Sequence, residues 1–215
     1  MKIADRKLEE VQVFLEKAVE IIINAGIVAF PTNSVYGLGC DPTNLNAIEK
    51  IYDIKFRDRS KGLLLLISDY EEATKIAEFN ETARKLADKY WPGQLTLILN
   101  KKEPCIIPPE VTAFQDTIGL RVPENEIILN ILKRLKSEGH YGGVIGTSAN
   151  YSGEPPSISG EEVTKKILSP IDLIIDGGKS KSKLPTTIVD CTTNEVKFLR
   201  IGAISDEDIL EFLSK

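Results

Sequence analysis

The first apolar positions of the chain recur at the spacing of one helix face, at Leu8, Val11, Leu15, Val19, Ile22 and Ile23. This pattern predicts an amphipathic helix that is capped at Asp5 and stopped at Gly26. The apolar run Ile27 to Phe30 then predicts a short buried strand, because Pro31 ends it. The carboxyl end of this strand leads into the polar, glycine-containing loop Thr32 to Asp41.

Similar patterns alternate along the rest of the chain. Helices are predicted near Asn46 to Ile54, Glu71 to Glu78, Thr82 to Tyr90, Glu126 to Lys136 and Asp206 to Leu213, the last capped by Ser205. Strands are predicted at Leu63 to Ile67, Leu95 to Leu99, Ile118 to Val122, Gly143 to Gly146, Leu173 to Asp176, Thr187 to Cys191 and Val196 to Ile201. Early strands alternate with helices while the last three strands follow one another closely. We therefore expect an α/β fold with a mixed sheet that is largely covered on both faces.

The length and composition indicate a globular protein. The chain has 215 residues, of which 42% are hydrophobic. This is enough to bury a core as one domain, or one domain with a small appendage, and it excludes a fibrous or disordered protein. The net charge is -5 and the pI is about 5.2. Because the surface as a whole repels polyphosphate, any anion site must be local.

The cysteines, the histidine and the N-terminus bear on metals and location. Cys40, Cys105 and Cys191 lie far apart with no CxxC pair, and His140 is the single histidine. A structural zinc is therefore not expected. The charged start Met1 to Glu10 and the odd number of cysteines favour a reducing cytoplasm. The longest nearly uncharged apolar stretch is about half of what crosses a bilayer, so no membrane contact is expected.

The loop Pro31 to Gly39 is the first candidate binding segment. Loops at the carboxyl ends of strands commonly bind ligands in open α/β sheets. Hydroxyls at Thr32, Ser34 and Tyr36 could orient a small polar ligand, and the two glycines permit close approach of the backbone. An ordinary strand-to-helix turn uses the same residue types, so that interpretation stays open.

A cluster of cations precedes the predicted strand Leu63 to Ile67, at Lys55, Arg57, Arg59 and Lys61. In an acidic protein such a cluster is a candidate triphosphate clamp, because arginine grips pairs of oxygens and lysine supplies a point charge. A solvated loop is the alternative. No P-loop motif is present and no GxGxxG motif follows a strand, so nucleotide binding would need another architecture.

Two further features suit a polar ligand. The segment Gly146 to Gly153 carries small hydroxyl and amide side chains, among them Ser148 and Asn150. They could hold phosphate oxygens or a ribose, or form an ordinary turn. Arg121 lies in the apolar run Ile118 to Val122, where a buried guanidinium needs an anionic partner. That partner is either an internal carboxylate, the commoner case, or a substrate carboxylate.

A series of short motifs runs through the chain in order: PTNSVYGLG, the Lys55-x-Arg57 pair leading to KGLLLL, WPGQLTL, TIGLRVP, TSANYSG, PTTIVD and FLRIG. Each motif alone is weak. The ordered set, from about Gly26 to Gly202, resembles the YrdC-like threonylcarbamoyl-AMP synthase family.

The resemblance implies a twisted mixed β-sheet flanked by helices, the YrdC-like fold, with a deep, positively lined cleft. It also implies a nucleotidyltransferase that uses L-threonine, bicarbonate or CO₂, and ATP with Mg²⁺. The products are threonylcarbamoyl-adenylate and pyrophosphate. Because the chain ends soon after FLRIG, we expect the short form of the family, with residues 1–215 as a single YrdC-like domain.

The same resemblance implies the substrate contacts. Around ATP it places Lys55, Arg57, Lys61, Ser148, Asn150 and Arg200. Around threonine it places Ser34, Thr117, Arg121 and Thr186. Lys55 and Arg57 would act electrostatically, and no side chain is assigned as a nucleophile or a metal ligand. Ser34 stands where the family commonly has threonine, and Lys61 where many members have asparagine, but neither change removes a charge or hydroxyl that the chemistry needs.

In the family, the intermediate serves a separate threonylcarbamoyl transferase complex, which modifies the adenosine beside the anticodon of tRNA (t6A). Two alternatives compete with this function. An RNA-binding module is disfavoured by the acidic pI and the lack of an aromatic stacking platform. A carbamoyl transferase acting on another acceptor, as in hydrogenase maturation proteins, is disfavoured because the sequence lacks acylphosphatase and zinc-finger segments.

Overall fold

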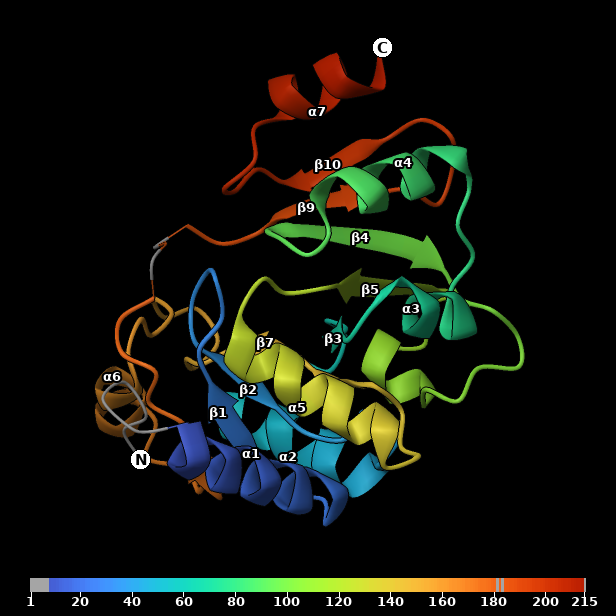
Figure 1. Cartoon of the computed structure of the whole chain (residues 1–215). Coiled ribbons are helices and arrows are strands. Elements are labelled where there is room, and N and C mark those ends of the chain that lie inside the picture. Colours follow the sequence, from blue (N-terminus) through green and yellow to red (C-terminus); the bar gives the residue numbers. More distant parts are fainter. Residues whose placement is uncertain (1–7, 181, 183, 215) are drawn as a thin grey trace.

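The computed structural model describes residues 8–180, 182 and 184–214. Figure 1 shows two β-sheets with helices packed against them. The helices are α1 (Leu8–Ile23), α2 (Leu45–Lys55), α3 (Tyr70–Ile76), α4 (Glu81–Tyr90), the 3₁₀ helix η1 (Pro109–Thr112), α5 (Glu126–Ser137), α6 (Gly160–Lys166) and α7 (Asp206–Leu213). The strands are β1 (Val28–Phe30), β2 (Gly37–Gly39), β3 (Leu64–Ile67), β4 (Leu95–Asn100), β5 (Thr117–Arg121), β6 (Gly143–Ile145), β7 (Thr147–Ser148), β8 (Leu173–Ile174), β9 (Thr187–Asp190) and β10 (Lys197–Arg200). The cap predicted at Asp5 lies outside the described residues.

Both sheets are mixed. The first has the strand order β7, β2, β1, β8, in which β1 and β8 are parallel and the other pairs are antiparallel. The second has the order β10, β9, β4, β5, β3, β6, in which β4 is parallel to β9 and β3 is parallel to β5. Its other pairs are antiparallel.

The mixed α/β fold is as predicted, but the strands divide between two sheets rather than forming one. Strands β2 and β7 were missed because they are only three and two residues long and consist mainly of glycine and hydroxyl residues. The three late strands also separate, because β8 joins β1 whereas β9 and β10 join the second sheet. A contact between distant residues helps to place β8, since the Ile27 amide donates to the Asp172 carboxylate at 2.7 Å.

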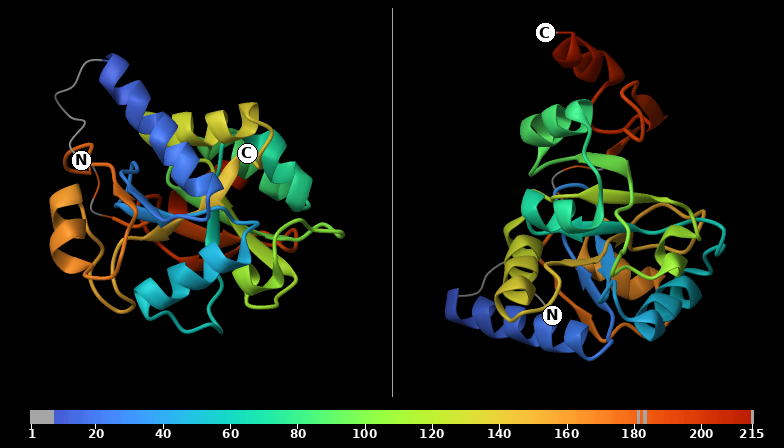
Figure 2. Two further views of the ribbon diagram at one scale, coloured as in Figure 1. Left: turned by 90° about the horizontal axis from the view of Figure 1, so that it is seen from below. Right: turned by 90° about the vertical axis from the view of Figure 1, so that its right-hand side faces the viewer.

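Helices α1 and α5 connect the two sheets through a shared core. They lie side by side (Figure 2). Their inward faces follow the helical period that the sequence shows. One buried cluster combines Leu15, Ala18, Val19 and Ile22 of α1, Ile128, Ile131, Leu132 and Leu135 of α5, Val28 and Phe30 of β1, Leu66 of β3 and Val144 of β6. The apolar faces of these two helices therefore hold both sheets in one core.

Side-chain caps explain where most helices begin. Asn44, Asp69, Asn80, Asn125 and Ser159 each accept a hydrogen bond from a backbone N–H of the first helical turn. Ser205 caps α7, which confirms that prediction. Helices α6 and η1, seven and four residues long, were not predicted.

Gly39 is the point at which β2 packs most closely on its neighbours. A Cβ atom there would lie 2.7 Å from the Ile145 carbonyl oxygen and 2.6 Å from a ring atom of Phe30. We therefore expect Gly39→Ala to lower the free energy of unfolding by about 1 to 3 kcal/mol, the usual cost of overpacking a core. Urea unfolding of the two proteins measures the difference. An unchanged midpoint would show that the Ile145 backbone can move away without cost.

Candidate active site

A pocket of about 690 Å³ lies between the two sheets. Its size falls in the range of small-molecule and cofactor sites. Both sheets supply its lining: β2, β7 and the loop after β1 from the first, and β3, β4, β5, β9 and β10 from the second. Two of the predicted binding loops, Pro31 to Gly39 and Gly146 to Gly153, thus meet at one site.

The structure brings together most of the residues that the resemblance selected. Ser34, Arg57, Thr117, Arg121, Ser148, Asn150, Thr186 and Arg200 all line the pocket. Lys55 and Lys61 do not belong to its lining. The binding roles of all ten residues stay predictions, but eight of them share one cavity.

Arg121 is the most deeply buried cation of this lining. Its side chain lies at the end of β5 and the residue is 4% exposed. Its guanidinium donates to the Gly93 carbonyl oxygen at 2.8 Å, to the Ser34 hydroxyl at 3.1 Å and to the side-chain oxygen of Asn33. All three acceptors are neutral. Within the described residues, no carboxylate forms an ion pair with Arg121, so the internal partner that we considered is not found there.

The electrostatics of Arg121 follow from this environment. Burial, together with repulsion from Arg200, lowers the pKa of Arg121 to about 9. A charge without a counter-charge in a partly desolvated site is costly, and an anionic ligand relieves that cost. The pocket also presents Arg57 and Arg200, against Glu154 as the acidic residue of its lining. The site therefore favours an anion.

The contacts of the hydroxyls beside Arg121 show which hydroxyl donates and which accepts each hydrogen bond. The Thr32 hydroxyl donates to the Val35 carbonyl oxygen at 2.7 Å, so its one proton is used. The Ser34 hydroxyl lies 3.0 Å from the Thr32 oxygen and must donate to it. Ser34 also accepts from Arg121, and its second lone pair is left. Ser34 therefore offers an acceptor to a ligand donor such as an amine.

A β-bulge directs Arg200 into the pocket. On β10, Phe198 pairs with Val189, but Arg200, rather than Leu199, pairs with Ile188. Because side chains of a strand alternate between faces, this extra residue puts Arg200 on the side of Ile188, which lines the pocket. Arg200 then donates to the Thr186 carbonyl oxygen and to the Thr186 hydroxyl, each at 2.9 Å.

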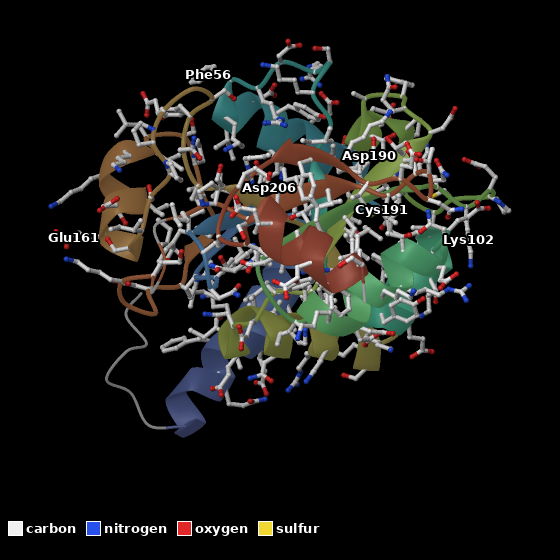
Figure 3. All side chains as sticks on the ribbon, turned by 90° about the horizontal axis from the view of Figure 1, so that it is seen from above. Phe56, Lys102, Glu161, Asp190, Cys191 and Asp206 are labelled. Carbon is white, nitrogen blue, oxygen red and sulfur yellow. The ribbon has the colours of Figure 1, made fainter. Side chains whose placement is uncertain are left out.

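Arg57 lines the pocket, whereas its neighbour Phe56 does not. Its guanidinium donates to the carbonyl oxygens of Lys61 at 3.1 Å and Gly62 at 2.7 Å. These bonds hold the loop before β3 and orient the guanidinium along the pocket lining. Burial lowers the pKa of Arg57. Phe56 has a left-handed backbone with φ of 48° and is exposed at the periphery, beside α2 (Figure 3).

Lys55 reaches the site indirectly. Its side chain is buried, and its ammonium donates to the Ser148 carbonyl oxygen and, at 2.7 Å, to the Asn150 carbonyl oxygen. The Ser152 amide bonds back to the Lys55 carbonyl oxygen at 2.9 Å. Lys55 therefore fixes the loop that carries Ser148 and Asn150. Burial, with a smaller contribution from Arg57, lowers the pKa of Lys55 to about 7.

Asn150 also shapes this loop. Its side-chain nitrogen donates to the carbonyl oxygens of Tyr151 and Glu154, each at 2.8 Å. Both amide hydrogens are thus used within the loop, and neither remains for a phosphate oxygen. The half-buried Ser148 presents its hydroxyl from the end of β7. Of these two residues, Ser148 is the better placed to donate to a ligand.

The sequence reasoning missed the residues that support Arg121. Gln94 donates from its side chain to the Asn33 carbonyl oxygen, while the Asn33 side chain accepts from Arg121 and from the Glu124 amide. Both residues lie inside motifs of the ordered series, Asn33 in PTNSVYGLG and Gln94 in WPGQLTL. Nothing in the sequence indicated that the two segments touch, because this contact is made between the two sheets.

Comparison with known proteins connects this site to one family. A sequence profile of Sua5_yciO_yrdC, described as telomere recombination, matches residues 20–202. A Pyrococcus abyssi protein named threonylcarbamoyl-AMP synthase is 35% identical over 184 residues, covering 85% of this chain and 52% of that protein. A Methanocaldococcus jannaschii protein, provisionally given the same name, is 35% identical over 206 residues, covering 95% of this chain and 93% of that protein. The chain thus spans about half of the first relative and nearly all of the second.

A solved structure agrees with these sequences. The crystal structure of P. abyssi Sua5 in complex with L-threonine superposes with a TM-score of 0.89 at 32% identity. The match covers 99% of this chain and 60% of that one.

The buried amine of Lys55 predicts a pH dependence of stability. Its pKa falls from 10.5 to about 7 on folding, so between these values the unfolded chain holds a proton that the folded chain has lost. Stability therefore rises with pH in this window. Lys55→Met lacks the group, so the advantage of the wild type over this variant should grow by on the order of 1 to 3 kcal/mol between about pH 7 and pH 9.

Urea unfolding at several pH values measures this difference. Lys85→Met, at an exposed site of α4, is the control for loss of a positive charge. A wild-type advantage that shrinks as the pH rises would mean that Lys55 stays charged through a partner other than the two carbonyl groups.

Proposed function

Because the chain belongs to the Sua5/YciO/YrdC family, we propose that it is a threonylcarbamoyl-AMP synthase. It forms L-threonylcarbamoyladenylate and pyrophosphate from L-threonine, bicarbonate or CO₂, and ATP. The names of its relatives and the threonine complex of P. abyssi Sua5 support this assignment. The reaction makes it a nucleotidyltransferase.

The observation that carries the proposal is Arg121. Its guanidinium is buried, three neutral groups hold it in place, and it faces a pocket that also contains Arg200 and Arg57. The carboxylate of an amino acid supplies the missing counter-charge. Ser34, beside it, offers an acceptor to the amine of the same molecule. An α-amino acid thus matches both the charge and the hydrogen-bond polarity of this end of the pocket.

The proposed chemistry needs positioning rather than a protein nucleophile. The amine of threonine attacks CO₂, loses a proton and becomes a carbamate. A carbamate oxygen then attacks the α-phosphorus of ATP, and the bond to the bridging oxygen of pyrophosphate breaks. Negative charge spreads over phosphate oxygens in this step, so fixed donors and cations stabilise it. Arg57, Arg200 and the Ser148 hydroxyl would hold the phosphates, while Lys55 keeps the loop of Ser148 in place.

Mg²⁺ would accompany ATP. This ion prefers oxygen ligands and keeps several waters, and it usually binds through substrate phosphates with one or two carboxylates. The pocket offers the Glu154 carboxylate and the hydroxyls of Thr147 and Ser148, which suit a magnesium-bound triphosphate. The ion would neutralise phosphate charge.

The product would pass to a later step of tRNA modification. Threonylcarbamoyl-adenylate is a mixed anhydride, and exclusion of water from the pocket would protect it. A threonylcarbamoyl transferase complex acting on tRNA would consume it to give t6A, and the reaction would occur in the cytoplasm. None of the helices in residues 8–180, 182 and 184–214 is long and apolar enough to cross a membrane.

Substrate dependence tests the proposed function. Pyrophosphate release from ATP should require threonine and bicarbonate together, because the carbamate must form before the α-phosphorus is attacked. Serine should react more slowly, since one methyl contact in a fitted pocket contributes about 1 to 3 kcal/mol. Mass spectrometry should detect threonylcarbamoyl-adenylate. Release of pyrophosphate at the same rate with every amino acid, or with none, would contradict the assignment.

Arg121→Lys tests the threonine end of the pocket. Lysine keeps the charge but cannot maintain three hydrogen bonds in the plane of a guanidinium. Threonine binding should weaken by about 1 to 3 kcal/mol, the range for hydrogen bonds to charged groups, while ATP binding stays nearly unchanged. Calorimetric titration with each ligand measures both.

A second arginine serves as the control for this variant. Arg134→Lys alters an exposed arginine of α5 that pairs with Glu16 and Glu138, so it should bind both ligands as the wild type does. Unchanged threonine affinity in folded Arg121→Lys would remove Arg121 from the substrate site.

A further inference from the structure

A pair of buried hydroxyls lies in the pocket beside Arg200. Thr96 of β4 and Thr186, which directly precedes β9, have their hydroxyl oxygens 3.1 Å apart. Both residues line the pocket; Thr96 is 0% exposed and Thr186 is 4% exposed. The resemblance that selected Thr186 did not select Thr96.

The protons of this pair can be counted. Thr186 accepts a hydrogen bond from Arg200, so the Arg200 contact uses a lone pair and no hydroxyl proton. The contact between Thr96 and Thr186 uses one of their two hydroxyl protons, whichever residue donates it. No further acceptor for either hydroxyl is found among the described residues. One proton is therefore left, and it belongs to an oxygen atom in the pocket lining.

We propose that Thr96 is a substrate-positioning residue, which together with Thr186 presents one hydroxyl proton to an acceptor oxygen of the bound threonine. This inference rests on the proposed function for the identity of the ligand. Thr96 is 0% exposed whereas Thr186 is 4% exposed, so Thr186 is the residue of the pair that can meet a ligand. In that arrangement Thr96 donates to Thr186, and Thr186 donates to the substrate. The Thr96 hydroxyl therefore determines where the remaining proton points.

The surroundings of the pair fit this role. Arg200 fixes the Thr186 hydroxyl from one side, and Arg121 and Arg200 lie near enough for Arg200 to lower the pKa of Arg121. A donor held next to the Arg200 guanidinium suits an electron-rich oxygen. The Ser34 hydroxyl has the opposite polarity, because its own proton is donated to Thr32. The pocket thus combines an acceptor for the amine with a donor for an oxygen of the same amino acid.

Two substitutions at one position separate the hydroxyl from the shape of the side chain. Thr96→Val keeps the volume and the preference for a strand but lacks the hydroxyl, whereas Thr96→Ser keeps the hydroxyl. In calorimetric titrations, Thr96→Val should bind threonine about three- to tenfold more weakly than the wild type, the effect of one hydrogen bond. Thr96→Ser should remain within about twofold of the wild type, because it retains the donor.

Thr187→Val is a matched control on the neighbouring strand. Thr187 is also fully buried, but its hydroxyl donates to the Ile204 carbonyl oxygen and accepts from the amides of Gly202 and Ile204. It does not line the pocket. This variant should lose stability in thermal unfolding and keep its threonine affinity, which separates a general loss of a buried hydroxyl from the loss at Thr96.

The outcomes distinguish this inference from the proposed function. If the wild-type protein binds no threonine, the proposed function fails. If the wild type binds threonine and Thr96→Val binds it equally well, the positioning role of Thr96 is wrong. An equal loss in Thr96→Val and Thr96→Ser would also overturn it, because the loss would then follow the shape of the side chain rather than its hydroxyl.

Discussion

The uncompensated charge of Arg121 is the constraint around which the pocket is organised. A guanidinium in a buried strand position costs free energy unless its hydrogen bonds and its charge are satisfied. The fold gives one acceptor to each of the three guanidinium nitrogens, namely a carbonyl, a hydroxyl and an amide oxygen, but it supplies no counter-charge among the described residues. Two of the five N–H groups have no acceptor in the described part of the chain, so the arrangement favours a ligand that brings a carboxylate.

These bonds also connect the two sheets. Asn33 and Ser34 follow β1 of the first sheet, whereas Gly93 precedes β4 and Arg121 ends β5 of the second. The Arg121 guanidinium therefore links the segment after β1 in the first sheet to the segment before β4 in the second sheet. Lys55 makes a comparable connection, from the end of α2 to the loop after β7. The hydrogen-bond partners of both residues are neutral backbone or side-chain oxygens, so neither side chain receives a counter-charge from these contacts.

A close backbone contact at Gly202 positions the part of the pocket wall that β10 forms. At Gly202, which follows β10, a Cβ atom would lie 2.3 Å from the Pro185 carbonyl oxygen and 2.7 Å from the Thr186 carbonyl oxygen. Only glycine allows this approach, which brings β10 against the segment that carries Thr186. The bulge at Leu199 then turns Arg200 toward the Thr186 hydroxyl. Within the FLRIG motif, the bulge and the glycine therefore both help to position the Arg200 guanidinium.

The sequence alone determined the helices, the longer strands and the approximate set of pocket residues. Helical and strand periods are local properties, so α1, α5, β3, β4 and β5 could be predicted within a few residues. Through their resemblance to a known family, the ordered motifs selected ten residues, eight of which line one pocket. Strands β2 and β7 are too short to show an alternation of apolar and polar residues, so they could not be predicted from the sequence. Without these strands, the division into two sheets could not be predicted either.

Tertiary structure alone decided what each polar residue does. Lys55 and Arg57 are two residues apart in the sequence, yet one is buried under the Ser148 loop and the other lines the pocket. The sequence left open whether Arg121 pairs with a carboxylate, and its partners proved to be neutral groups from distant segments. The donor or acceptor role of each hydroxyl, and the importance of Asn33, Gln94 and Thr96, likewise depend on contacts that only the folded chain makes. Composition and spacing cannot reveal such contacts, because a hydrogen bond is decided by the distance and direction between atoms that only the folded chain brings together.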